Sequence, residues 1–158
     1  MTTATKTQYS FQWIALLGLL TALGPLSIDM YMPALPEMAV EFGTTTISIS
    51  NSIPAYFLGL ALGQLFYGSL SDRIGRKPPL YIGLVIYCIG SILCIFAHSE
   101  WALIGARVLQ ALGGCVGVVM ARAAIRDSLD VRTSAQALAH MAMILGIAPI
   151  IALYSVRY

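Results

Sequence analysis

The chain has 158 residues, of which 58% are hydrophobic and only 10% are charged. A water-soluble domain carries about 25% charged residues, so this composition excludes an ordinary soluble fold and indicates a membrane protein. The formal net charge is +2, and no basic cluster is interleaved with aromatic residues, which excludes a nucleic-acid-binding protein.

Apolar stretches with few charges follow one another along the chain, and each is long enough for the roughly 20 residues of a membrane-spanning helix. The sequence therefore predicts an all-α membrane protein. We place the helices at 11–32, 48–70, 79–97, 101–122 and 134–155.

The lysines and arginines that flank these predicted helices occur in alternate connections, and therefore on one side of the membrane. They precede the first helix, lie between the second and third, and lie between the fourth and fifth: Lys6, Arg73, Arg76, Lys77, Arg122, Arg126 and Arg132. Basic loops remain on the cytoplasmic side of a membrane. We therefore expect residues 1–10 and the loops 71–78 and 123–133 to be cytoplasmic, with the other connections outside.

The first candidate functional residue is Asp29, at the end of the first predicted helix. Pro25 precedes it and predicts a bend, because proline removes a backbone hydrogen bond. An acid near the bilayer is costly unless it is paired or hydrated, and this marks Asp29 as a candidate for proton binding. A solvated acid at the helix end is the simpler alternative.

Glycines spaced four residues apart mark two of the predicted helices. Gly59 and Gly63 lie in the second helix, and Gly113 and Gly117 lie in the fourth. Small residues at this spacing let two helix backbones approach closely, which is the main packing device in lipid. We assign these glycines to helix packing rather than to transport.

The second candidate is Arg107, six residues after Trp101 in the fourth predicted helix and so roughly 9 Å along it. A guanidinium at this depth must face the bundle interior and find an acid, carbonyl groups or water. Asp29 is the expected partner, and such a pair could respond to a proton. Gln110 shares a helix face with Arg107. A static structural pair, or an arginine that reaches toward the interface, is the alternative.

No metal site, cofactor site or catalytic set is expected. Cys88, Cys94 and Cys115 lie in apolar stretches without a CxxC pattern, so they are interpreted as small apolar packing residues. His98 falls in a predicted external loop, and His140 alone is weak support for a proton relay. The sequence therefore predicts that the protein is not an enzyme.

The most specific pattern connects the second and third predicted helices. It reads Gly68-x-Leu70-x-Asp72-Arg73-x-Gly75-Arg76-Lys77, and it resembles the signature loop of the major facilitator superfamily. The pattern Arg107-x-x-Gln110-x-x-Gly113 is similar to that family's helix-4 motif. The stretch from Pro25 to Pro36 resembles the end of helix 1 in the bicyclomycin-resistance (Bcr/CflA) group of drug:proton antiporters.

This resemblance implies the N-terminal five helices of a twelve-helix major facilitator fold. It also implies a secondary transporter of the bacterial inner membrane that exports drug-like small molecules, driven by the proton gradient and without a cofactor. Asp29 and Arg107 would link protonation to substrate binding. The signature loop would brace these helices against a C-terminal half, where Asp72 would meet a helix.

The fifth predicted helix departs from the family. Its motif continues past a Gly-Pro to a Gly-Gly in the family, whereas here Ala148-Pro149-Ile150-Ile151-Ala152 leads into unrelated residues. We therefore expect a truncated chain whose missing partner is the C-terminal half of the transporter.

Two other functions stay open: a sugar or metabolite proton symporter of the same superfamily, and a membrane fragment that does not transport. The expected partners are the lipid bilayer, a drug-like substrate and protons, with no nucleic acid. Aromatic residues that would suit a cavity for planar or cationic drugs, but that packing explains more simply, are Tyr31, Tyr56, Phe57 and Tyr67.

Overall fold

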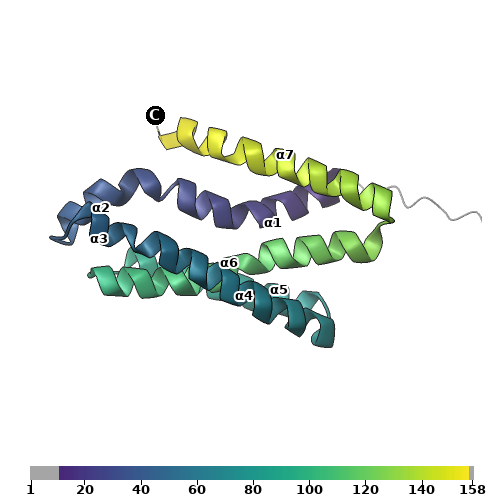
Figure 1. The fold of residues 1–158 in the computed structure, drawn as a ribbon, viewed down its shortest axis with the longest axis horizontal. Coiled ribbons are helices and arrows are strands. Elements are labelled where there is room, and N and C mark those ends of the chain that lie inside the picture. Colours follow the sequence, from purple (N-terminus) through teal and green to yellow (C-terminus); the bar gives the residue numbers. More distant parts are fainter. Residues whose placement is uncertain (1–10, 157–158) are drawn as a thin grey trace, which may run out of the picture.

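The computed structural model describes residues 11–156, and within them the regular elements are all helical (Figure 1). The predicted all-α class is confirmed. The long helices are α1 (Phe11–Asp29), α4 (Ser52–Ile74), α5 (Lys77–Ile95), α6 (Glu100–Ser128) and α7 (Val131–Val156). A short connection between α1 and α4 contains the 3-10 turn η1 (Met32–Ala34), α2 (Leu35–Glu41) and α3 (Thr46–Ser50).

Several of these helices are suited to a bilayer by length and composition. In the described part of the chain, four helical stretches qualify: Gln12–Glu41, Thr46–Ile74, Lys77–Ile95 and Glu100–Ser128. The fifth predicted crossing corresponds to α7. The side chains of 147–156, including the predicted departure at 148–152, lie outside the described residues, as does the predicted cytoplasmic segment 1–10.

The helices run further at their basic ends than the apolar pattern predicts. The predicted loop 71–78 is reduced to residues 75–76, and the predicted loop 123–133 is reduced to residues 129–130. Charged residues mark where a helix leaves the apolar layer, but they continue its backbone hydrogen bonding, so they are poor markers of its end. Gly75 ends α4 with a φ of 85°, a left-handed conformation that glycine adopts without strain.

The first predicted helix, 11–32, is shorter than expected, because α1 ends at Asp29. Pro33 and Pro36 lack an N–H group to continue the ladder, and each lies in the first turn of a new helical segment. The second predicted helix, 48–70, is divided in the same way into α3 and α4.

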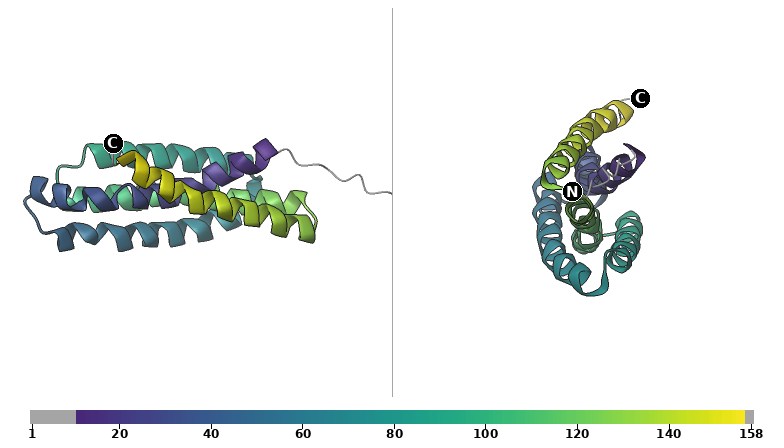
Figure 2. Two further views of the ribbon diagram at one scale, coloured as in Figure 1. Left: turned by 90° about the horizontal axis from the view of Figure 1, so that it is seen from above. Right: turned by 90° about the vertical axis from the view of Figure 1, so that its right-hand side faces the viewer.

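Helix α6 is the central element of the bundle (Figure 2). It packs along α4 and α5 and also contacts α1 and α7, whereas α4 and α5 touch each other little. Accordingly, 56% of its most apolar window is buried, compared with 17% for α5.

Glycines allow these helices to approach so closely. A Cβ atom on Gly113 would lie 2.5 Å from the carbonyl oxygen of Gly83 in α5, and one on Gly59 would lie 2.7 Å from the carbonyl oxygen of Val108. The same close contact joins Gly63 to the Cys115 side chain, and Gly117 to the carbonyl oxygen of Leu20 in α1. All four glycines assigned to packing therefore lie at helix–helix contacts.

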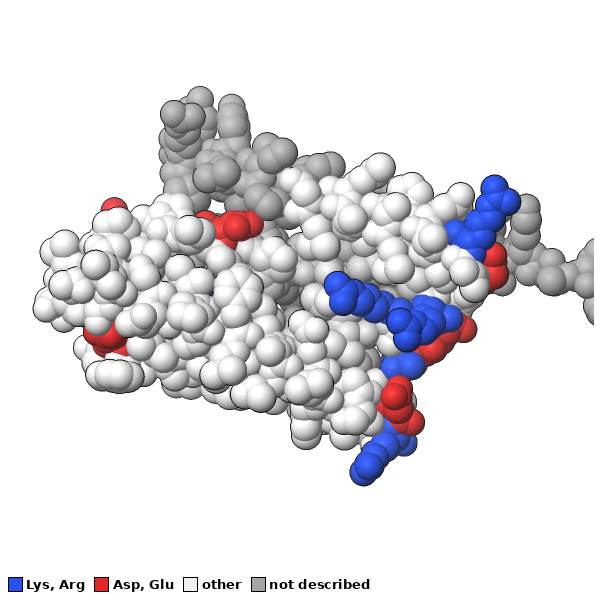
Figure 3. All heavy atoms as spheres, viewed as in Figure 1, with Lys and Arg blue, Asp and Glu red and all other residues white. Residues whose placement is uncertain are grey.

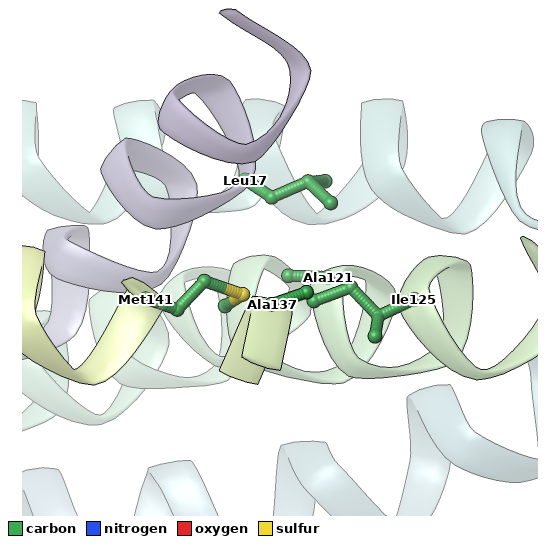
Figure 4. Packing of buried hydrophobic residues seen from close by; sticks show 5 residues of the cluster. All are labelled: Leu17, Ala121, Ile125, Ala137 and Met141. Carbon is green, nitrogen blue, oxygen red and sulfur yellow. The ribbon is translucent and has the colours of Figure 1, made fainter. Parts of the chain in front are cut away.

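Helix α7 is held against the bundle by a small apolar cluster (Figure 4). Its buried members come from α1, α6 and α7, and they are Leu17, Ala121, Ile125, Ala137 and Met141. Because two of the five are alanines, the three helices lie close together at this end.

Asp130 caps the start of α7. A hydrogen bond from the side chain of Thr133 is the main cause that lowers the pKa of the Asp130 carboxyl, and the N–H of Ser134 donates to the Asp130 carbonyl at 2.8 Å. A carboxylate cap satisfies the open N–H groups of the first helical turn. Because its pKa is lower in the folded state than in the unfolded state, the cap stabilises α7 above the unfolded pKa and is lost as pH falls through the folded pKa.

We therefore expect Asp130→Ala to speed hydrogen exchange in the first turn of α7 at pH 7, with the difference from the native chain vanishing toward about pH 2. Asp130→Asn keeps a side-chain oxygen that does not titrate, so its first turn should exchange as in the native chain at pH 7 and should keep this protection as the native cap is lost at low pH. An Asp130→Ala effect of equal size at both pH values would contradict the assignment of a charged cap.

Candidate functional site

Arg107 lies inside the bundle, about 10 Å from the start of α6, with only 9% of its surface exposed. Its Nη1 donates hydrogen bonds to the carbonyl oxygen of Ser27 at 3.2 Å and to Oε1 of Gln110 at 2.9 Å. Its Cζ lies 3.6 Å from the centre of the Tyr31 ring, a cation–π contact. The buried Nε finds no hydrogen-bond partner among the described residues.

The broken end of α1 supplies the acceptor for this arginine. In a continued helix the N–H of Tyr31 would bond to the carbonyl of Ser27, but here it bonds to the carbonyl of Ile28 at 3.1 Å. The Ser27 carbonyl therefore takes its hydrogen bond from Arg107. Nearby, the Tyr56 hydroxyl donates to the carbonyl of Gly24 at 3.3 Å.

Gln110 extends the site to α5. Its Nε2 donates to the Ser91 hydroxyl at 2.8 Å, and that hydroxyl donates to the carbonyl of Tyr87 at 2.8 Å. The Tyr87 hydroxyl in turn lies 2.7 Å from the Ser27 hydroxyl. These contacts form a polar network that joins α1, α5 and α6 where water is scarce and polar groups need internal partners.

Asp29 does not pair with Arg107 in this conformation, and this corrects the predicted ion pair. The ion pairs of the described residues all involve Arg76 instead. Ser27 and Tyr31, four residues apart, both contact Arg107, whereas Asp29 lies midway between them and so on the other side of the helical turn. Its side chain is half-buried. The sequence indicated a similar depth for both charges but not their directions.

A hairpin formed by the short helices α2 and α3 covers this site. Its core, which we call the hairpin cluster, consists of Tyr31, Leu35, Ala39, Ile49 and Leu103. Two hydroxyl groups of the hairpin attach it to the start of α6. Thr44 donates to Oε2 of Glu100 at 3.2 Å, and Ser48 donates to Oε1 at 2.6 Å. This role of Glu100 was not predicted from the sequence, because its partners are more than 50 residues away.

Lysines and arginines gather at the opposite end, where α4 meets α5 and α6 meets α7 (Figure 3). Arg76 connects several side chains at this end. Its Nε donates to Asp127 at 2.9 Å, and its Nη1 donates to Ser71 at 2.7 Å and to Asp72 at 3.3 Å. Asp127 was not predicted from the sequence, because it lies in the part of α6 expected to be a loop.

A cavity of about 280 Å³ opens between α4 and α6 beside this cluster. Its lining includes Asp72, Arg76, Arg122, Arg126 and Gly68. A Cβ on Gly68 would meet nothing within 4 Å, so this glycine keeps the cavity open rather than packing a helix.

The remaining candidate residues lie apart from the Arg107 network and from the contacts of Arg76. Arg73 and Lys77 of the signature loop are exposed, as are His98 and His140. The three cysteines are free thiols, and no group of metal-ligating side chains occurs within residues 11–156.

A helical bundle with a buried arginine network, apolar outer faces and a basic end is the architecture of a multi-pass membrane protein. Residues 17–156 match the family model of the Major Facilitator Superfamily, and the chain belongs to this family.

Similar proteins include one named as an MFS-type transporter and others named as multidrug resistance proteins. The chain is 36% identical over 137 residues to the uncharacterized MFS-type transporter YdgK of Bacillus subtilis (strain 168). It is 36% identical over 133 residues to multidrug resistance protein MdtL of Klebsiella pneumoniae (strain 342), and 34% identical over 122 residues to multidrug resistance protein D of Escherichia coli (strain K12). These alignments cover 87%, 84% and 77% of the chain, but only 34%, 34% and 31% of the relatives. The chain thus spans about a third of their length.

Proposed function

We propose that this chain forms the first five helices of a proton-coupled exporter of drug-like molecules, of the Bcr/CflA group, in the bacterial inner membrane. The observation that carries the proposal is the buried guanidinium of Arg107 at the broken end of α1, with one N–H donor left over. A buried charge is expensive in a bilayer and marks a functional site. The similarity to relatives named multidrug resistance proteins supports the drug-like substrate.

The two charges of the site have separate roles in this proposal. Asp29 is half-buried, takes no hydrogen bond from the described residues, and is the carboxylate that exchanges a proton or a cationic group. Arg107, with Gln110, fixes the end of α1 and thereby the position of Asp29.

The basic end has a conformational role. With the N-terminus in the cytoplasm, the gathering of lysines and arginines agrees with the preference of basic loops for that side. Arg76 ties the α4–α5 connection to α6, and the Asp72 side of the cavity is left to receive a helix from the remaining two thirds of a full-length transporter.

The test uses a graft in which residues 11–156 replace the matching segment of MdtL. Inverted membrane vesicles with an imposed pH gradient should release protons when a cationic drug that also carries a carbonyl group, such as puromycin, is added. Asp29→Asn should lower this drug-dependent proton release at least about tenfold, because an amide does not exchange protons in this range.

Glu37→Gln is the matched control, since Glu37 is an exposed acid in α2 on the same side of the bundle. Full proton-coupled export by the Asp29→Asn graft would refute the assignment. Uptake of radiolabelled sugars by the graft, with no response to drugs, would favour a symporter instead.

A further inference from the structure

Tyr31 connects the arginine site to the hairpin that covers it. One face of its ring lies 3.6 Å from Cζ of Arg107, and its hydroxyl lies 2.6 Å from the hydroxyl oxygen of Ser52 in α4. Ser52 donates its only hydrogen to the carbonyl of Ile49 at 2.6 Å. Tyr31 must therefore be the donor in its bond with Ser52, and this hydroxyl acts as a tether for the ring.

The ring closes the site from the side of the hairpin. Tyr31 is 6% exposed and belongs to the hairpin cluster, so its ring moves only when the hairpin moves. Beneath it, Nε of Arg107 is buried without a partner. An unsatisfied donor on a charged group is costly in such surroundings. With the ring of Tyr31 in place, Nε of Arg107 is therefore a buried hydrogen-bond donor that an oxygen acceptor of a ligand would satisfy.

We infer that Tyr31 is a positioning residue that acts as a lid on Arg107, and that the ligand admitted when it opens carries a carbonyl or carboxylate oxygen. This inference rests on the proposed transport function, because it assigns the chemistry of a substrate group to the same site. Opening requires two events: the hydroxyl of Tyr31 leaves Ser52, and the ring leaves the guanidinium. The hairpin therefore closes and covers Arg107 in the same movement.

The test measures protection of Arg107 in the 158-residue chain, reconstituted in vesicles of phosphatidylethanolamine and phosphatidylglycerol. The probe is phenylglyoxal, a small neutral dicarbonyl that modifies guanidinium groups. Its rate at Arg107 is followed by peptide mass spectrometry and divided by the rate at the exposed Arg73. In the native chain Arg107 should be protected.

Removal of the ring in Tyr31→Ala should raise the modification rate about thirtyfold, the effect of a desolvated cation–π contact. Tyr31→Phe keeps the ring and removes the hydroxyl tether. Most of the protection should therefore remain, with a modification rate at Arg107 about fivefold above that of the native chain. Ser52→Ala should give the same modification rate at Arg107 as Tyr31→Phe. A chain with both substitutions should react no faster than either single variant.

Tyr67→Ala is the matched control, because Tyr67 is also a buried tyrosine but lies in α4 and belongs to another cluster. This variant should leave Arg107 protected. The lid is refuted if Tyr31→Ala stays protected, if Tyr31→Phe reacts as fast as Tyr31→Ala, or if Tyr67→Ala exposes Arg107 equally. An unchanged Ser52→Ala would refute the tether. Since no transport is measured, failure of drug export by the graft with protection intact would remove the proposed function and leave the lid.

Discussion

Gly113→Ala should destabilise the bundle by about 1–3 kcal/mol, and Gly113→Leu should cost more, because the added atoms would overlap the backbone of α5. The obstacles are the carbonyl oxygen of Gly83 and the amide nitrogen of Tyr87. Neither is the end of a flexible side chain, so relief requires α5 to move away from α6. The free energy of unfolding in a dodecyl sulfate titration would measure the effect.

Gly105→Ala is the matched control in the same helix. A Cβ there would meet nothing within 4 Å, so the substitution should be neutral or should stabilise α6 by up to about 1 kcal/mol through helix propensity. If both alanine variants changed stability equally, the close α5–α6 contact would not be the cause.

Arg107→Lys should destabilise the protein even though it keeps the positive charge. Each hydrogen bond to the guanidinium contributes about 1.5–3 kcal/mol. One ammonium group cannot reach the Ser27 carbonyl and the Gln110 side chain while also covering the Tyr31 ring, because it lacks the planar fork of arginine. The lysine would leave a poorly partnered charge inside the bundle.

Arg107→Met separates charge from geometry. Methionine loses the same hydrogen bonds but needs no partner for a buried charge, so it should be more stable than Arg107→Lys in the same titration. Arg126→Lys, at an exposed position of the same helix, should stay within about 0.5 kcal/mol of the native chain. Native stability in Arg107→Lys would show that charge alone suffices at this position.

Much of the architecture follows from simple features of the sequence. Long apolar stretches indicate the membrane-spanning helices, and glycines spaced by four, such as Gly59 and Gly63, coincide with contacts to α6. These features are local, since each depends on residues within one helix. The inward position of Arg107 also follows from its depth alone.

The partners of the charged residues could not be predicted in the same way. The direction of Asp29 depends on where α1 ends, and prolines further along the chain help to determine that point. Tyr87 and Ser91 lie in an apolar helix whose pattern does not separate a polar network from a lipid-facing surface. Asp127 reaches Arg76 only because α6 continues beyond its apolar part.

The central place of α6 has a consequence for biosynthesis. The helices α4 and α5, made before it, find their main support in α6 rather than in each other, and α1 packs mainly against α7 and α6. A ribosome therefore delivers three apolar segments that must wait in the bilayer, loosely associated, until the next segment leaves the translocon. A nascent chain arrested after residue 97 should remain sensitive to membrane proteases, and one that includes α6 should become resistant.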